Sequence, residues 1–84
     1  MSSIYDPKYR VLIDCLKEIR LQSNVTQQEL ASYLGYSQAY ISKYEQGQKR
    51  LDIIEIREIC QFLGTSLLEV ISQFEERLEK EGLL

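Results

Sequence analysis

Histidine and tryptophan are absent from this sequence of 84 residues, which also has only two cysteines and one proline. Without histidine, and without a CxxC spacing for Cys15 and Cys60, the sequence argues against a zinc site and implies no cofactor. It has no glycine-rich phosphate loop and no carboxylates clustered on a predicted cleft, so we expect no enzymatic activity. The two cysteines lie on apolar faces of predicted helices and are expected to be buried, free thiols.

Long apolar runs are missing as well. No stretch approaches the roughly 18 apolar residues that a membrane span needs, and the N-terminal MSSIYDPKYR lacks the apolar core of a signal peptide. We therefore expect a cytoplasmic protein with no membrane partner. Few prolines and glycines argue against linkers, and the length predicts one domain over residues 1–84, with 44% hydrophobic residues to build its core.

The stretch 26–46, TQQELASYLGYSQAYISKYEQ, predicts two short helices joined by a tight turn. Thr26 and Glu29 have the spacing of a capping box, Gly35 follows the last apolar position of the first helix, and Ser37 can cap the second. Such a helix-turn-helix places its second helix in the DNA major groove. Two amphipathic helices that only build a core would share much of this pattern. Ile41 and Tyr44 face inward in either case, and the outward row is then Gln38, Ala39, Ser42 and Lys43.

Apolar residues at helical spacing predict three more helices, at about residues 7–23, 53–63 and 66–81, and no strands. The expected core of this all-α, five-helix domain spans about residues 8–72, followed by a C-terminal helical extension over about 73–84. Asp52 and Ser66 can cap the last two helices, and Gly47 and Gly64 can end the helices before them. The expected inward residues are Leu12, Cys15, Leu16 and Ile19, then Ile53, Ile56, Ile59, Cys60 and Leu63, then Leu67, Val70 and Ile71.

The net charge of −3 is unevenly distributed along the chain. Residues 1–35 are neutral overall, residues 36–50 carry a local charge of +2, and residues 51–84 carry −5. The positive block coincides with the second helix of the predicted helix-turn-helix and the loop after it. This distribution fits a protein that binds DNA through one face only.

Taken together, these residues resemble the lambda-repressor/Cro-like helix-turn-helix domains, the XRE family of bacterial and phage regulators. The resemblance covers roughly residues 10–71. It implies a transcriptional regulator whose partner is double-stranded DNA. Asn24, Tyr36 and Leu51-Asp52 depart from the residues usual in the family. The residues that carry the resemblance are Arg20, TQQELA at 26–31, Gly35, Ser37, Ile41, Ser42, Tyr44-Glu45, Gly47, Ile59-Cys60 and Leu63-Gly64.

The resemblance also implies roles for single residues. The outward row of the second helix would meet base edges, Gln27 and the basic pair Lys49-Arg50 would hold phosphates, and Arg20 would form a structural pair with Glu45. For Gln27 an ordinary exposed position stays open, and for Tyr36 partial burial over the turn stays open. The candidate DNA-binding residues are Gln27, Tyr36, Ser37, Gln38, Ala39, Tyr40, Ser42, Lys43, Lys49 and Arg50.

More apolar residues remain than a small monomer usually leaves exposed, which favours a homodimer. The interpretation is a homodimeric repressor on a palindromic operator, with no small-molecule ligand implied. Two alternatives stay open: an antitoxin or controller-type regulator, and a protein-interaction module that has lost operator binding. The expected dimer interface consists of Leu51, Ile54, Leu68, Ile71, Phe74 and Leu78.

Overall fold

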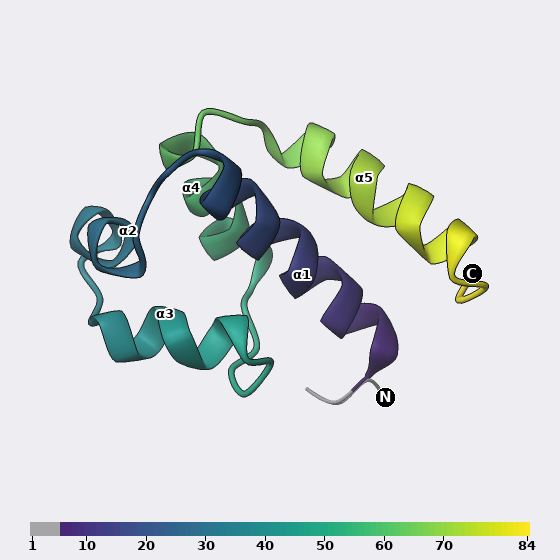
Figure 1. Ribbon diagram of the computed structural model, residues 1–84, viewed down its shortest axis with the longest axis horizontal. Helices are drawn as coiled ribbons and strands as arrows, with labels where there is room; N and C mark the ends of the chain where they lie inside the picture. The colour runs from purple at the N-terminus through teal and green to yellow at the C-terminus, as the bar shows by residue number, and fades with distance from the viewer. Residues whose placement is uncertain (1–5) are drawn as a thin grey trace.

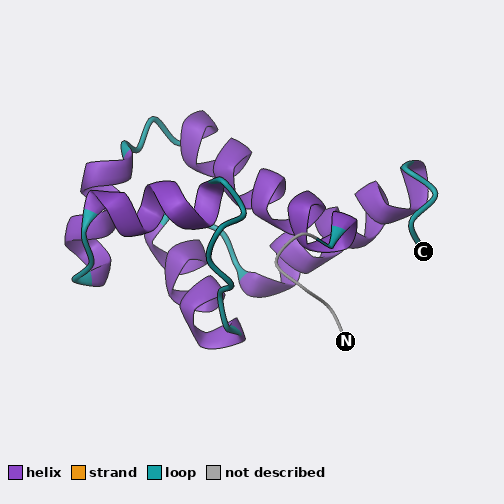
Figure 2. Cartoon of the chain, turned by 90° about the horizontal axis from the view of Figure 1, so that it is seen from below, coloured by secondary structure: helices purple, strands orange, loops and turns teal. Residues whose placement is uncertain are grey.

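Five α-helices joined by short turns form the computed structural model, which describes residues 6–84. Residues 1–5, part of the segment considered above for a signal peptide, lie outside the described residues. The predicted all-α class is confirmed, and the helix ends agree with the prediction within one residue. Within the described range no strand is present (Figure 2). The helices are α1 (Pro7–Gln22), α2 (Gln27–Leu34), α3 (Gln38–Glu45), α4 (Ile53–Phe62) and α5 (Leu67–Lys80).

The helices begin at side chains that accept hydrogen bonds from their first turns. Thr26 and Glu29 form the predicted capping box, in which Thr26 Oγ1 accepts from the Glu29 amide at 3.0 Å and Glu29 accepts in return at 2.9 Å. Ser37, Asp52 and Ser66 cap α3, α4 and α5 as predicted. The hydrogen bonds from Thr26 lower the pKa of Glu29 below its ordinary value.

Helix ends also follow local chemistry. Gly35 ends α2 with a φ of 76°, in the left-handed region that residues with a Cβ rarely adopt. Asn24, at the corner between α1 and α2, has a φ of 58°. Asparagine tolerates this conformation better than most residues with a side chain, which explains how the corner accepts it.

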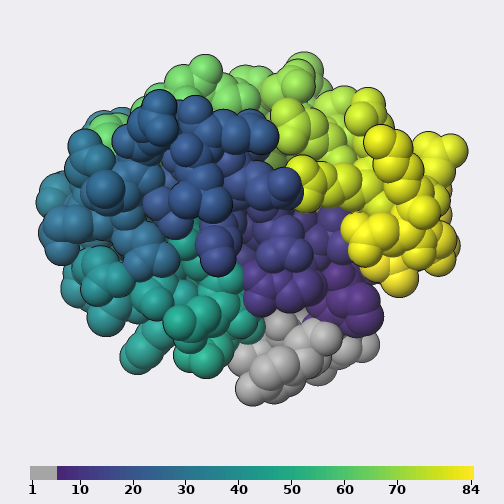
Figure 3. Space-filling model, viewed as in Figure 1, coloured from purple at the N-terminus to yellow at the C-terminus, as the bar shows by residue number. Residues whose placement is uncertain are grey.

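The helices pack around α1, which runs through the middle of the molecule (Figure 1). Helix α5 lies along α1, α2 packs against both α3 and α4, and α3 lies at the edge opposite α5 (Figure 1). The molecule measures 35 × 24 × 20 Å. In Figure 3, the region around residues 36–50 and the end of the chain occupy opposite ends of the visible face. None of the helices within residues 6–84 combines the length and apolar content required to cross a membrane.

All five helices contribute fully buried side chains to the core, and Cys15 and Cys60 are buried, free thiols as expected. Burial raises the pKa of both thiols. Helix α1 is buried more broadly than its predicted stripe, because α5 packs along it and α3 also contacts it. The core cluster is Tyr9, Ile13, Leu16, Leu30, Ala31, Ile41, Tyr44, Leu51, Ile56, Ile59, Cys60, Leu63 and Val70.

Three sequence-based expectations about burial are wrong. Leu51 and Leu78 were expected at a dimer interface, but both side chains are buried within the monomer. The Leu51 amide donates to the Tyr9 hydroxyl at 3.0 Å and its side chain packs in the core cluster, and Leu78 lies two turns beyond Val70 on the buried side of α5. Ile53 was expected in the core but is 60% exposed at the first position of α4. Helix α5 runs without interruption to Lys80, one residue before the end that the sequence predicts.

Candidate nucleic-acid interface

Helix α3 is held by its inward side and leaves its outer side to solvent. Ile41 and Tyr44 are fully buried. Gln38, Ala39 and Lys43 are exposed, as their helical spacing predicts. Ser42 is half-buried, and its hydroxyl accepts a hydrogen bond from Gln46 Nε2 at 3.1 Å. Ser37, at the N-cap, is exposed and accepts from the Tyr40 amide at 3.2 Å.

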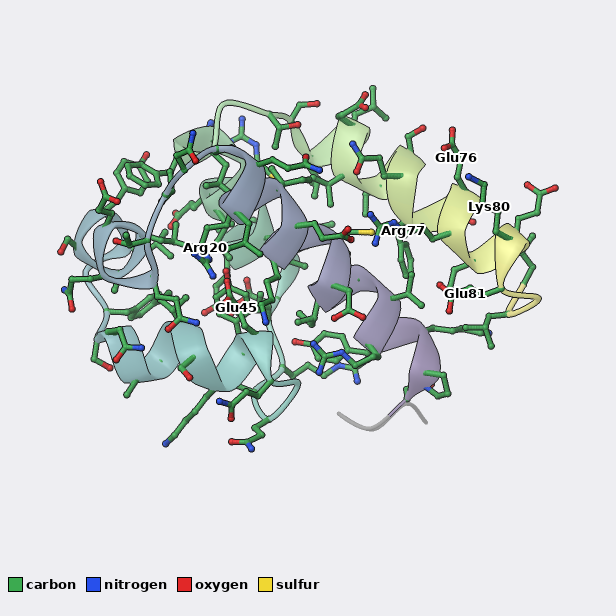
Figure 4. The ribbon with its side chains drawn as sticks, in the orientation of Figure 1. Arg20, Glu45, Glu76, Arg77, Lys80 and Glu81 are labelled. Carbon is green, nitrogen blue, oxygen red and sulfur yellow. The ribbon has the colours of Figure 1, made fainter. Side chains whose placement is uncertain are left out.

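Arg20 of α1 and Glu45 at the end of α3 point toward each other in the interior (Figure 4). Arg20 Nε donates to Glu45 Oε2 at 2.6 Å, and Nη2 donates to Oε1 at 3.0 Å. The third nitrogen, Nη1, donates to the Val25 carbonyl at 2.7 Å. The hydrogen bonds to Glu45 raise the pKa of Arg20 above its ordinary value, and this two-point ion pair fixes α3 to α1.

Gln27 extends this pair toward the start of α3. Its Nε2 donates to Glu45 Oε1 at 2.8 Å, while its Oε1 accepts from Gln38 Nε2 at 2.5 Å. Gln27 is half-buried, so it is not the ordinary exposed first-turn residue that the sequence left open. A chain of hydrogen bonds therefore runs from Arg20 in the interior to Gln38 on the surface.

Tyr36 and Tyr40 form a stacked pair beside α3, with ring centroids 4.2 Å apart. The Tyr40 hydroxyl donates to Glu55 Oε2 of α4, and the Tyr36 hydroxyl lies 3.5 Å from the same oxygen. Tyr40 is one of the candidate DNA-binding residues, but its side chain is half-buried and Glu55 accepts the proton of its hydroxyl, so that proton is not offered to a phosphate. Burial and the hydrogen bond to Glu55 raise the pKa of Tyr40 far above its ordinary value. Tyr36 remains partly exposed over the turn.

The loop after α3 is anchored by the start of α1. The Tyr9 hydroxyl donates to the Lys49 carbonyl at 2.7 Å, and Arg10 Nη2 donates to the Glu45 carbonyl at 2.6 Å. Gly47 has a φ of 78°, which residues with a Cβ rarely adopt, so the backbone of this turn favours glycine; a Cβ there would lie 2.9 Å from Arg10 Nη1, the movable end of a flexible side chain. Both anchors leave the basic residues of the loop at the surface.

Lys49 and Arg50 are both exposed, and each lies over an aromatic ring. Lys49 Nζ is 5.5 Å from the Tyr40 ring centroid, and Arg50 Cζ is 4.6 Å from that of Tyr9. Cations at these distances are attracted to the ring face, which restrains otherwise flexible side chains. Sequence reasoning missed Tyr9, which continues the apolar stripe of α1 three residues before Leu12 and could have been found by that spacing.

Part of the acidic excess of residues 51–84, on α5 and at its end, lies away from α3. Glu76 on α5 and Glu81 just after its end, with Lys80 nearby, lie on the opposite side of the molecule from α3 (Figure 4). Arg77 of the same helix pairs with Glu18 of α1. The loop after α3 keeps Lys49 and Arg50 exposed, and Glu55 of α4 is a carboxylate that contacts α3, through the Tyr40 hydroxyl.

Known proteins share the helix-turn-helix of this chain. The profile of the helix-turn-helix family HTH_3 matches residues 16–70. The uncharacterized HTH-type transcriptional regulator y4dJ of Sinorhizobium fredii is 33% identical over 58 residues, covering 69% of this chain and 75% of that protein.

Two solved structures share the fold. The XRE-family like protein from Pseudomonas syringae pv. tomato has a TM-score of 0.80 and 38% sequence identity, covering 88% of this chain and 90% of that one. The clp gene regulator ClgR from Corynebacterium glutamicum has a TM-score of 0.80 and 25% identity, covering 89% and 80%.

Proposed function

The chain belongs to the XRE family of helix-turn-helix DNA-binding transcriptional regulators, and we propose that it is a homodimeric repressor that binds a palindromic operator. The observation that carries the proposal is the outward row of α3. Gln38, Ala39 and Lys43 stand exposed on a helix whose position is fixed by the buried Arg20–Glu45 pair.

Each exposed side chain of this row suits a base edge in the major groove. A glutamine amide can hydrogen-bond adenine N6 and N7, a lysine can reach guanine O6 and N7, and an alanine methyl can contact thymine. Gln38 is the best oriented of the three, because Gln27 holds its Nε2. Ser42 is the least available, because it is half-buried and bonded to Gln46.

Phosphate contacts are proposed for the ends of the helix-turn-helix. Lys49 and Arg50 are exposed on the loop after α3, and the N-terminus of α2 offers backbone N–H groups and the positive end of the helix dipole. Gln27 contributes on the same side, with the added task of holding Gln38. Tyr36 and Ser37 lie at the turn between the two helices, within reach of the same strand.

The dimer is proposed to form through exposed apolar side chains of α4 and α5. Ile54 is 62% exposed and Leu68 is 81% exposed, while Ile71 and Phe74 are half-buried nearby on α5. Two copies related by a two-fold axis would present two α3 helices to the same side of a duplex, and their half-sites would lie about 10 base pairs apart.

Two measurements test the proposal. Selection of bound sequences from random DNA is expected to enrich a palindrome with that spacing, and sedimentation at micromolar concentration is expected to give twice the monomer mass. Ile54→Glu and Leu68→Glu should shift the mass toward monomer and weaken operator binding. Leu21→Glu, at another exposed leucine, should do neither. A monomer that binds DNA as tightly as the wild-type protein, or a selection that enriches nothing, would contradict the proposal.

Repression in particular needs its own test. A repressor is expected to lower transcription from a promoter that overlaps the selected operator, and an activator to raise it. A protein-interaction module would give no salt-sensitive DNA binding at all, so a gel shift over a range of salt concentrations separates that function from the one proposed.

A further inference from the structure

Glu55 joins three segments around α3 through one carboxylate. Its Oε1 accepts the Asp52 amide at 2.9 Å, which completes the capping box at the start of α4. Its Oε2 accepts from the Tyr40 hydroxyl of α3 and lies 3.5 Å from the Tyr36 hydroxyl in the turn before α3. The capping box of α4 uses only Oε1 of Glu55. The contact of Oε2 with Tyr40 is therefore not explained by capping.

Tyr40 in turn connects Glu55 to the loop that is proposed to hold phosphate. One ring contact of Tyr40 is the stack on Tyr36, and another is the ammonium of Lys49, 5.5 Å from the ring centroid. The ring can restrain Lys49 only if the ring itself is held. The hydrogen bond to Glu55 supplies that restraint at the far end of the side chain.

The negative charge of Glu55 lies close to the proposed DNA-binding face. A free carboxylate near bound DNA would repel phosphates, and it would also attract Lys49 away from them. Glu55 keeps its charge, but the hydrogen bonds from the Asp52 amide and the Tyr40 hydroxyl hold its carboxylate in place, while the Lys49 ammonium lies over the Tyr40 ring. This arrangement lets an acidic residue lie beside a DNA-binding face.

We propose that Glu55 is a positioning residue for DNA binding, which fixes Tyr40 and, through the Tyr40 ring, Lys49. Helix α3 and the loop after it then meet the duplex as one unit. This inference rests on the proposed operator binding. It adds a residue of α4, outside the helix-turn-helix, to those that determine affinity.

The test uses Tyr40→Phe, which removes the hydroxyl and keeps the ring, in the full chain. The hydrogen bond to Glu55 is present in the free protein, so affinity should fall only by the cost of ordering a released side chain on binding, about 2- to 13-fold for the selected duplex. The Lys49→Ala substitution should cost less in the Tyr40→Phe background than alone, because the two residues act together. Glu55→Gln should reproduce part of the loss, since one amide oxygen cannot serve both partners.

The control is Asp52→Ala, which removes the other half of the capping box and leaves Glu55 Oε2 free to hold Tyr40. Both variants are measured well below their unfolding temperatures. Asp52→Ala should lower thermal stability and leave affinity close to that of the wild-type protein. Equal losses of affinity in the control and in Tyr40→Phe would overturn the positioning role, as would wild-type affinity in Tyr40→Phe.

A Lys43→Ala arm separates this inference from the proposed function. Suppose that the wild-type protein binds the selected duplex, that Lys43→Ala weakens this binding and that Tyr40→Phe leaves it unchanged. In that case only the proposed role of Glu55 is contradicted. If the wild-type protein enriches no sequence, the proposed function fails and the role of Glu55 fails with it.

Discussion

Removal of either partner of the Arg20–Glu45 pair should destabilise the domain strongly. The Arg20 side chain is 8% exposed and that of Glu45 is 2% exposed, so the remaining partner would be a buried charge without its counter-ion. Such a loss costs about 3–5 kcal/mol. A chain of this length has a free energy of unfolding of about 4–13 kcal/mol in total, so each single variant should lose a large part of it.

The assay is thermal and urea unfolding of Arg20→Met, Glu45→Leu and the double variant. Since each kcal/mol shifts the midpoint of a domain this small by about 4–8 °C, the single variants should melt about 12–40 °C lower. The double variant should cost much less than the sum, because neither charge remains. The matched control is the exposed pair Arg77–Glu18, whose side chains are 34% and 49% exposed and whose coupling should be about 0.2–1 kcal/mol. Additive losses at Arg20 and Glu45 would refute the reasoning.

Three further outcomes follow from buried groups. Tyr44→Phe should stabilise the protein by about 1 kcal/mol in urea unfolding, because the Tyr44 hydroxyl is buried without a hydrogen-bond partner among residues 6–84; a loss of stability would show that the hydroxyl has a partner. Burial raises the pKa of Tyr44 and Tyr40, so the folded state retains phenolic protons that the unfolded state loses above about pH 10. Stability is therefore fully present below pH 10 and should fall as the pH rises above it, less steeply in Tyr44→Phe than in the wild-type protein. Cys15 and Cys60 should react with an alkylating reagent only as fast as the protein opens, and rapid labelling of the native protein would contradict their burial.

Local features of the fold were predictable from the sequence. The capping box of Thr26 and Glu29 and the left-handed Gly35 depend on residues within one helical turn, and each side chain or φ preference acts almost independently of the rest of the chain. The inward burial of Ile41 and Tyr44 followed from helical period alone. Even here a first-turn position misled, because Ile53 has helical spacing but lies where α4 has not yet met the core.

Contacts between distant segments were not predictable in the same way. The Tyr9 hydroxyl meets the Lys49 carbonyl 40 residues away, and Arg10 meets the Glu45 carbonyl 35 residues away. No periodicity in a single sequence encodes such pairs, since backbone carbonyls are common to all residues. Leu51 is buried where the Tyr9 hydroxyl accepts from its amide, 42 residues away in sequence. Since the sequence does not reveal this contact, Leu51 was expected to be exposed and was assigned to a dimer interface.

The candidate site divides along the same line. Exposure of Gln38, Ala39 and Lys43 follows from helix geometry and was predicted. The pairing of Arg20 with Glu45 was expected only from the resemblance to the XRE family, because nothing in the spacing of these two residues requires it. The hydrogen bond from the Tyr40 hydroxyl to Glu55 was not predicted, because it depends on how α4 packs beside α3.

The division of labour on the DNA-binding face is tested most directly by one binding series. Affinities of Lys43→Ala and Lys49→Ala are measured for the selected operator, for single-base variants of it and over a range of salt concentrations, with Lys80→Ala on α5 as the control. Lys43→Ala should lose about 1–3 kcal/mol on the operator and tolerate changes at one base pair. Lys49→Ala should weaken binding to every sequence alike and reduce the salt slope by about one, while Lys80→Ala should change neither. Uniform weakening by Lys43→Ala with altered sequence preference in Lys49→Ala would contradict the assignment, and wild-type binding by both would show that this face does not contact DNA.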